Sequence, residues 1–190
     1  QMLALLQEAG YRPVARLEEA GTVVVNTCGF IQPAVEEAVE TILEMVERKK
    51  VGTLDRLFVV GCFVQRYGYK LRREIPEVDG WAGTGEVLRI AELAASPRGG
   101  LPPFLIGRPG FVPGAGTPRL VSGPGFSTYL KIADGCAHRC TFCMIPRLRG
   151  PSRSRPAGSL VEEARELAGR GVVELNLVAQ DTTAYGRDLE

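Results

Sequence analysis

Two short apolar runs near the start of the chain constrain its fold more than any other feature. Val23 to Val25 and Leu57 to Val60 are continuous rather than alternating, which is typical of strands buried on both faces of a parallel sheet. Residues 33–50 lie between them and repeat apolar side chains at helical spacing, from a proline at the first position to a basic last turn. This alternation predicts an α/β fold with a parallel sheet.

The same pattern continues on both sides of these elements. Residues 2–9 are predicted to form a helix, residues 78–82 a strand and residues 87–95 a further helix, which completes an N-terminal α/β domain over residues 1–95. Residues 96–126 are rich in proline and glycine and lack periodicity, so we expect them to be a linker.

A second domain is predicted over residues 127–190. Residues 128–133 form the expected first strand, and residues 172–178 the second. Ser159 and Glu162 form a capping box that predicts a helix over residues 160–168. Strand, long loop, helix and strand together are the opening of a partial, TIM-like β/α barrel, whose active site lies at the carboxyl ends of its strands.

Length and composition narrow the class of protein. The chain has 190 residues and a net charge of +1, which is too small for a general attraction to nucleic acid. It has no apolar run near the roughly 18 residues of a membrane span, so we expect no membrane role. Five cysteines without a secretory leader are typical of the reducing cytoplasm. The chain begins inside a predicted helix and ends just after a predicted strand, so we expect it to be a fragment.

Three cysteines stand within eight residues of one another. Cys136, Cys140 and Cys143 have C-x3-C-x2-C spacing in a stretch poor in core-forming residues, which argues against three buried hydrophobic side chains. A disulfide between two of these cysteines would leave the third thiol unpaired. A closed zinc or four-iron site takes four ligands, so a four-iron cluster held by three thiolates would keep one iron open to another ligand. His138 stands between two of the cysteines, and we do not expect it to be a ligand.

The two remaining cysteines follow the buried strands of the first domain. Cys28 and Cys62 each come just after a strand, where open α/β folds place their ligands. They either share one site or are two unrelated buried thiols, because strand ends also bury cysteine readily.

Arginines surround the cysteine triplet. No acidic residue occurs between Gly135 and Val161, whereas five arginines do: Arg139, Arg147, Arg149, Arg153 and Arg155. This stretch is either a solvated loop or a patch that attracts an anionic cofactor group or an RNA-rich partner.

The triplet after a strand, with Phe142 just before its last cysteine, resembles the signature of radical S-adenosylmethionine (SAM) enzymes. The similarity extends to four further segments, and together they resemble the methylthiotransferases of RimO type. The segments are Asn26-Thr27-Cys28-Gly29-Phe30-Ile31, Gly61-Cys62 with Gln65-Arg66-Tyr67, residues 129–136, and residues 179–186.

This resemblance implies two four-iron, four-sulfur (4Fe-4S) clusters and SAM as cofactors. Cys136, Cys140 and Cys143 would hold the radical-generating cluster, and Cys28 and Cys62 match the second and third of the three cysteines that hold an auxiliary cluster. Phe142 and Gln180 would bind cofactor. The first auxiliary cysteine, the later barrel strands and a C-terminal RNA-binding-like β domain have no counterpart in this sequence, so we expect the fragment itself to be inactive.

The resemblance also implies a reaction. One electron would cleave SAM to a deoxyadenosyl radical, and a methylthio group would be added to the β-carbon of an aspartate of small-subunit ribosomal protein uS12. Flavodoxin or ferredoxin would donate the electron. The alternative within the family is methylthiolation of transfer RNA adenosine, against which Gly29-Phe30-Ile31 and Gln180-Asp181-Thr182-Thr183 argue. A more distant alternative is a non-catalytic zinc-binding or RNA-binding module.

Overall fold

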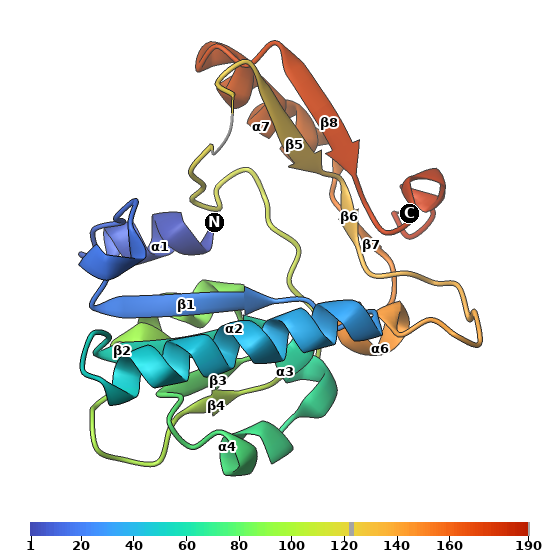
Figure 1. The fold of residues 1–190 in the computed structure, drawn as a ribbon. Coiled ribbons are helices and arrows are strands. Elements are labelled where there is room, and N and C mark those ends of the chain that lie inside the picture. Colours follow the sequence, from blue (N-terminus) through green and yellow to red (C-terminus); the bar gives the residue numbers. More distant parts are fainter. Residues whose placement is uncertain (122–123, 190) are drawn as a thin grey trace. The chain divides into compact units, whose positions relative to one another are not determined.

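A computed structural model describes residues 1–121 and 124–189 of the chain. These residues form two compact units, one spanning Met2–Pro109 and the other running from Gly110 onward and including Gln1 (Figure 1). The expected linker includes residues 122 and 123, and the expected barrel segment ends at residue 190. Those three positions lie outside the described residues.

The first unit contains the predicted parallel sheet. Its four strands are all parallel and stand in the order β1-β2-β3-β4. They span Thr22–Thr27 (β1), Arg56–Gly61 (β2), Gly80–Ala82 (β3) and Phe104–Leu105 (β4). The three strands predicted from the apolar runs are confirmed. Strand β2 is fully buried over its first five residues, as a central strand covered on both faces should be.

Helices cover both faces of this sheet. Alternate residues of β2 point to opposite sides, with Leu57 and Val59 in one apolar cluster and Phe58 and Val60 in the other. The first cluster is completed by α2 (Gln32–Lys50), α3 (Cys62–Tyr67) and α4 (Lys70–Glu74), and the second by α1 (Met2–Glu8) and α5 (Ile90–Ala94). Two 3-10 turns, η1 (Leu17–Glu19) and η2 (Val87–Arg89), precede β1 and α5. The first unit is therefore a three-layer α/β/α structure.

The stretch that we expected to be a linker contributes strand β4. The Trp81 amide donates to the Pro103 carbonyl over 2.9 Å, and the Gly83 amide donates to the Leu105 carbonyl over 2.8 Å. Proline has no amide hydrogen, but its carbonyl still accepts, and a short edge strand tolerates proline. Residues 104–105 therefore extend the sheet despite their proline-rich context.

The second unit pairs two strands in parallel across a helix. Strand β5 (Ser127–Lys131) pairs with β8 (Glu174–Val178), and α7 (Ala157–Gly169) lies between them in the chain. This strand, helix and strand order confirms the predicted opening of a β/α barrel. The intervening loop holds elements that the sequence pattern did not indicate. These are the antiparallel pair β6 (Ala133–Asp134) and β7 (Arg153–Ser154), and helix α6 (Ile145–Arg149); η3 (Thr182–Ala184) follows β8.

The predicted capping box at the start of α7 is wrong. The helix begins at Ala157, and its N-cap residue Pro156 offers no side-chain hydrogen bond. Ser159 is already inside the first turn, where its hydroxyl accepts from the Ala115 amide over 3.2 Å and from Arg155 over 3.0 Å. The serine therefore fixes neighbouring segments instead of capping the helix.

Candidate functional site

Cys28 and Cys62 lie at the same edge of the sheet in the first unit. Strands β1 and β2 are parallel and pair Thr27 with Gly61, and a cysteine follows each of these residues. The Thr27 hydroxyl donates to the Val60 carbonyl over 2.7 Å, which links the two strand ends. Cys28 is exposed, whereas Cys62 begins α3 and is only 2% exposed. The two thiol-bearing segments are thus neighbours at the carboxyl edge.

Two glycines let these segments approach closely. A Cβ on Gly29 would stand 2.8 Å from the Cys62 carbonyl carbon, closer than real Cβ contacts. Gly61 has a φ of +106°, and a Cβ there would stand 2.5 Å from the Thr27 carbonyl oxygen. Only glycine fits both positions without displacing the backbone. The cysteine-bearing segments are therefore in contact through their backbones.

Helix α3 fastens this edge with its polar side chains. The Arg66 guanidinium donates to the Gly29 carbonyl over 2.9 Å, which holds the segment after Cys28 against the helix that begins with Cys62. The Gln65 side chain accepts from the Thr84 amide over 3.2 Å and donates to the Gly107 carbonyl over 3.3 Å. The residues that follow β1, β2, β3 and β4 are thereby tied together.

The cysteine triplet lies in the second unit, on the loop between β6 and α6. The loop leaves β6 through Gly135, whose φ is +80°, and the Cys136 amide then donates to the Gly150 carbonyl over 3.2 Å. At its far end the Cys143 amide donates to the Cys140 carbonyl over 3.1 Å. Cys140 is exposed, and Cys136 and Cys143 are partly buried. The three thiols therefore stand on one largely accessible loop.

The thiols fit an iron–sulfur cluster in their chemistry. Cysteine thiolates are the ligands of such clusters, and none of the five cysteines forms a disulfide in this structure. Within residues 1–121 and 124–189, however, no group of three or more cysteine, histidine, aspartate or glutamate side chains is arranged to hold one metal ion. The three thiols of the triplet loop would therefore have to move toward one another when a cluster binds.

The two side chains expected to bind cofactor have different surroundings. Phe142 lies on the triplet loop with 89% of its surface exposed. Gln180 follows β8, and its buried Oε1 atom has no hydrogen-bond partner among the described residues. A buried acceptor without a partner costs free energy, and a hydrogen-bond donor on a bound ligand would remove this cost.

The arginines near the triplet do not form one patch. Arg155 is buried and forms an ion pair with Glu163 over 2.5 Å, so it belongs to the core of the second unit. Arg149 and Arg153 lie 3.6 and 4.0 Å from the carboxylate of Asp134, which Lys131 also contacts. Burial lowers the pKa of Lys131, although Asp134 opposes this effect. Asp134 directly precedes the stretch without acidic residues, and its carboxylate makes the excess of positive charge there smaller than the sequence suggested.

The histidine of the triplet loop has a defined partner. His138 Nε2 and Asp181 Oδ2 lie 2.7 Å apart, and an ionised carboxylate can only accept, so Nε2 carries the hydrogen. Hydrogen bonds from Thr183 and then from His138 hold the pKa of Asp181 below its ordinary value. The expectation that His138 is not a metal ligand stays a prediction, but its imidazole is already engaged.

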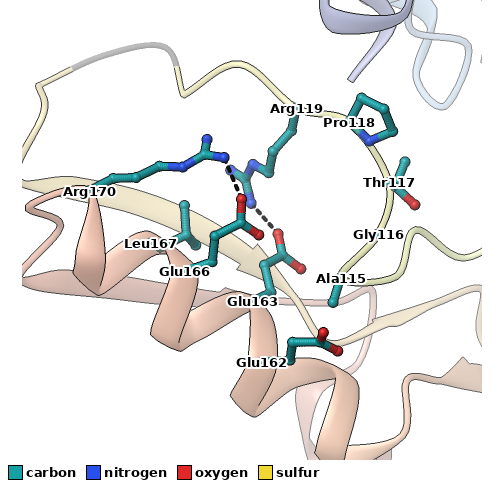
Figure 2. Close-up of a pocket in the computed structure, with 10 residues that line it drawn as sticks. All are labelled: Ala115, Gly116, Thr117, Pro118, Arg119, Glu162, Glu163, Glu166, Leu167 and Arg170. Carbon is teal, nitrogen blue, oxygen red and sulfur yellow. Dashed lines mark hydrogen bonds and ion pairs between the residues drawn. The ribbon is translucent and has the colours of Figure 1, made fainter.

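A cavity that sequence reasoning missed lies beside α7. It has a volume of about 370 Å³ and is lined by residues 115–119 and by side chains of the helix (Figure 2). Glu163 of α7 contacts Arg119 over 2.7 Å, and Glu166 of the same helix pairs with Arg170, which directly follows the helix. The missed signal was Glu163 at an otherwise core-facing position of the helix, eight residues after Arg155.

Comparisons with known proteins cover both units. Residues 1–83 match the family model described as "Uncharacterized protein family UPF0004", and residues 130–190 match that of the "Radical SAM superfamily". A solved radical S-adenosylmethionine methyltransferase, TsrM from Kitasatospora setae, superimposes with a TM-score of 0.53 at 16% identity, over 95% of this chain and 39% of that one. At this identity the structural similarity supports the fold alone.

Two relatives with higher sequence identity than the TsrM structure have the same name. The ribosomal protein uS12 methylthiotransferase RimO of Syntrophus aciditrophicus (strain SB) is 50% identical over 100% of this chain and 43% of its own length. The protein of the same name from Anaeromyxobacter sp. (strain K) is 51% identical over 99% of this chain and 40% of its own length. The chain thus spans about two-fifths of these curated relatives. Since the similarity extends over the whole chain and includes both family models, the chain belongs to the radical SAM methylthiotransferases of RimO type.

Proposed function

We propose that the protein containing this chain is an iron–sulfur enzyme that uses SAM to add a methylthio group to the β-carbon of an aspartate of ribosomal protein uS12. One observation carries the proposal. Over the whole chain, about half of the residues are identical to those of proteins named uS12 methylthiotransferases. The aligned region includes the strand, loop and helix that bear the cysteine triplet. The three thiols on an accessible loop supply the chemical basis, since they leave one iron of a four-iron cluster without a protein ligand.

We assign a separate cluster to each unit. Cys136, Cys140 and Cys143, within residues 127–190, would hold the cluster that generates the radical, and Cys28 and Cys62, within residues 1–95, would hold part of an auxiliary one. A cluster bound by the triplet would supply the electron that cleaves SAM. Gln180, whose buried acceptor has no partner among the described residues, and the exposed ring of Phe142 would hold the bound SAM. The residues of the protein would bind and orient SAM and exclude water from the site.

The partners follow from the same assignment. The substrate would be uS12, free or within the ribosome, and an electron donor such as flavodoxin or ferredoxin would reduce the cluster in the cytoplasm. No helix in the described part of the chain is both long and apolar enough to cross a membrane.

The proposed substrate is tested in cells with and without the gene. We expect mass spectrometry to show a methylthio group on one aspartate of uS12 only when the gene is present, with transfer RNA adenosines unchanged. Whole-gene complementation should restore the modification. A methylthio group that disappears from adenosine instead would assign the protein to the transfer RNA branch of the family.

The proposed clusters are tested by counting iron. After anaerobic reconstitution of the protein encoded by the whole gene, we expect about eight irons per chain, from two four-iron clusters. Replacing Cys136, Cys140 and Cys143 by alanine should remove about four of them and abolish reductive cleavage of SAM. Replacing Cys28 and Cys62 should remove about four others and spare cleavage. One colourless zinc ion instead of iron would support the non-catalytic alternative.

A further inference from the structure

The cysteine loop, residues 135–144, is anchored firmly at its start and its end. The Cys136 amide donates to the Gly150 carbonyl over 3.2 Å, and the loop ends at Ile145, where α6 begins. Between these points His138 contacts another segment: its side chain is 62% exposed, and its Nε2 lies 2.7 Å from Asp181 Oδ2. This hydrogen bond connects the centre of the loop to the segment after β8.

Asp181 is also held by hydrogen bonds within its own segment. One carboxylate oxygen accepts from the Thr183 amide over 3.0 Å and from the Thr183 hydroxyl over 2.7 Å, which caps the turn η3. The other oxygen faces His138. Only 17% of the Asp181 side chain is exposed, so its position is fixed by the segment after β8. Asp181 is therefore held by its own segment, and the more exposed His138 reaches it from the cysteine loop.

We propose that the His138–Asp181 hydrogen bond is a tether that positions the cysteine loop against the segment after β8. Both residues act as positioning residues and neither binds the cluster. Gln180 directly precedes Asp181, so the same bond sets the distance between the three thiols and the unsatisfied acceptor of Gln180. The bond matters for cluster binding only if the proposed function holds, whereas its effect on the loop does not depend on any cofactor.

The tether is tested in the metal-free protein encoded by the whole gene. Iodoacetamide is added, and mass spectrometry gives the alkylation rate of each cysteine. His138→Leu and Asp181→Ala should each raise the alkylation rates of the partly buried Cys136 and Cys143 about fivefold, which is the upper end of what an exposed charged pair contributes. The double variant should equal either single variant, because both remove the same bond.

If His138 and Asp181 acted on the thiols only through their charges, the two variants would change the alkylation rates in opposite directions. His138→Leu removes a possible positive charge near the thiols and would slow their reaction, whereas Asp181→Ala removes a negative charge and would accelerate it. A tether predicts acceleration in both variants. His138→Gln keeps a side-chain donor and should restore rates to within about twofold of the original protein.

The chain offers two controls. Cys28 lies in the other unit and is exposed, so its rate should not change in any variant. Arg170→Leu breaks the exposed ion pair between Arg170 and Glu166 of α7 and should leave the alkylation rates of the triplet unchanged. Unchanged rates in both tether variants, opposite changes in the two, or an equal rise at Cys28 would each overturn the proposal. A lack of iron binding by the original protein would refute the proposed function but leave this result standing.

Discussion

Replacing Glu163 by alanine is expected to destabilise the second unit by roughly 3–5 kcal/mol, the usual cost of removing one partner from a buried ion pair. Glu163 is only 5% exposed and its carboxylate bridges two arginines. It contacts Arg119 over 2.7 Å and Arg155 over 2.5 Å. Without it, the buried guanidinium of Arg155 and the partly buried guanidinium of Arg119 would both lose their compensating charge.

The cost is large because the two arginines connect separate segments. Arg119 also donates to the Tyr129 carbonyl over 3.0 Å and to the Thr128 hydroxyl over 3.1 Å, both on β5. Arg155 donates to the Lys131 carbonyl at the end of the same strand over 3.0 Å. Glu163 on α7 therefore joins the helix to the strand that leads into the cysteine loop.

Amide hydrogen exchange measures this effect locally. Two compact units need not unfold together, so a single global midpoint is not a suitable measure. Exchange of the α7 and β5 amides should accelerate strongly in Glu163→Ala, whereas the fluorescence of Trp81, which is buried in the first unit, should not change. The matched control is Glu166→Ala, whose exposed pair with Arg170 is worth less than about 1 kcal/mol. Equal effects of the two substitutions would contradict the assigned role of Glu163.

The elements predicted correctly from the sequence are those whose apolar residues fill a continuous core. Residues 57–60 are wholly apolar because β2 is covered by helices on both faces, and Val35, Ile42 and Val46 repeat at helical spacing because α2 packs on that sheet. In both places the local pattern and the tertiary packing require the same residues. The apolar pattern therefore sufficed to predict the parallel sheet of the first unit and the helix between its first two strands.

The elements that were missed depend on contacts distant in sequence. Strand β4 has two residues and follows two prolines, so it exists only because the edge of β3 offers partners to its carbonyls. Strands β6 and β7 are also two residues each, too short to show alternation. Arg155 looked like one of several loop arginines, but its charge is neutralised by Glu163 from α7. Local sequence carries no signal for such pairings.

The candidate sites were predicted in position but not in their supporting contacts. Spacing located Cys28 and Cys62 at strand ends, and the structure confirms that β1 and β2 end there. Whether their thiols share a cluster stays a prediction. The contact between Arg66 and the Gly29 carbonyl was not predicted, because a donor on a helix reaches a loop only after the sheet has formed.

Gly135→Ala is the substitution from which we expect the largest loss of cluster binding without removal of a thiol. The residue has a φ of +80°, which is unfavourable for alanine by roughly 1–3 kcal/mol. Its added Cβ would also collide with the carbonyl oxygens of Pro151 and Gly150, the second at 2.6 Å. Gly150 accepts the hydrogen bond of the Cys136 amide, so the collision falls on the anchor of the first thiol.

The measurement separates this local damage from general instability. In the protein encoded by the whole gene, Gly135→Ala should lose the roughly four irons of the triplet cluster and retain those of the auxiliary cluster. Gly158→Ala is the matched control, since a Cβ there meets no atom within 4 Å and the residue lies in α7. Alanine should stabilise that helix by about 0.4–1 kcal/mol with full iron content. Because the two substitutions add the same methyl group to the same unit, a difference in iron between them reports the geometry of the cysteine loop, and equal iron would show that this loop tolerates displacement of its anchor.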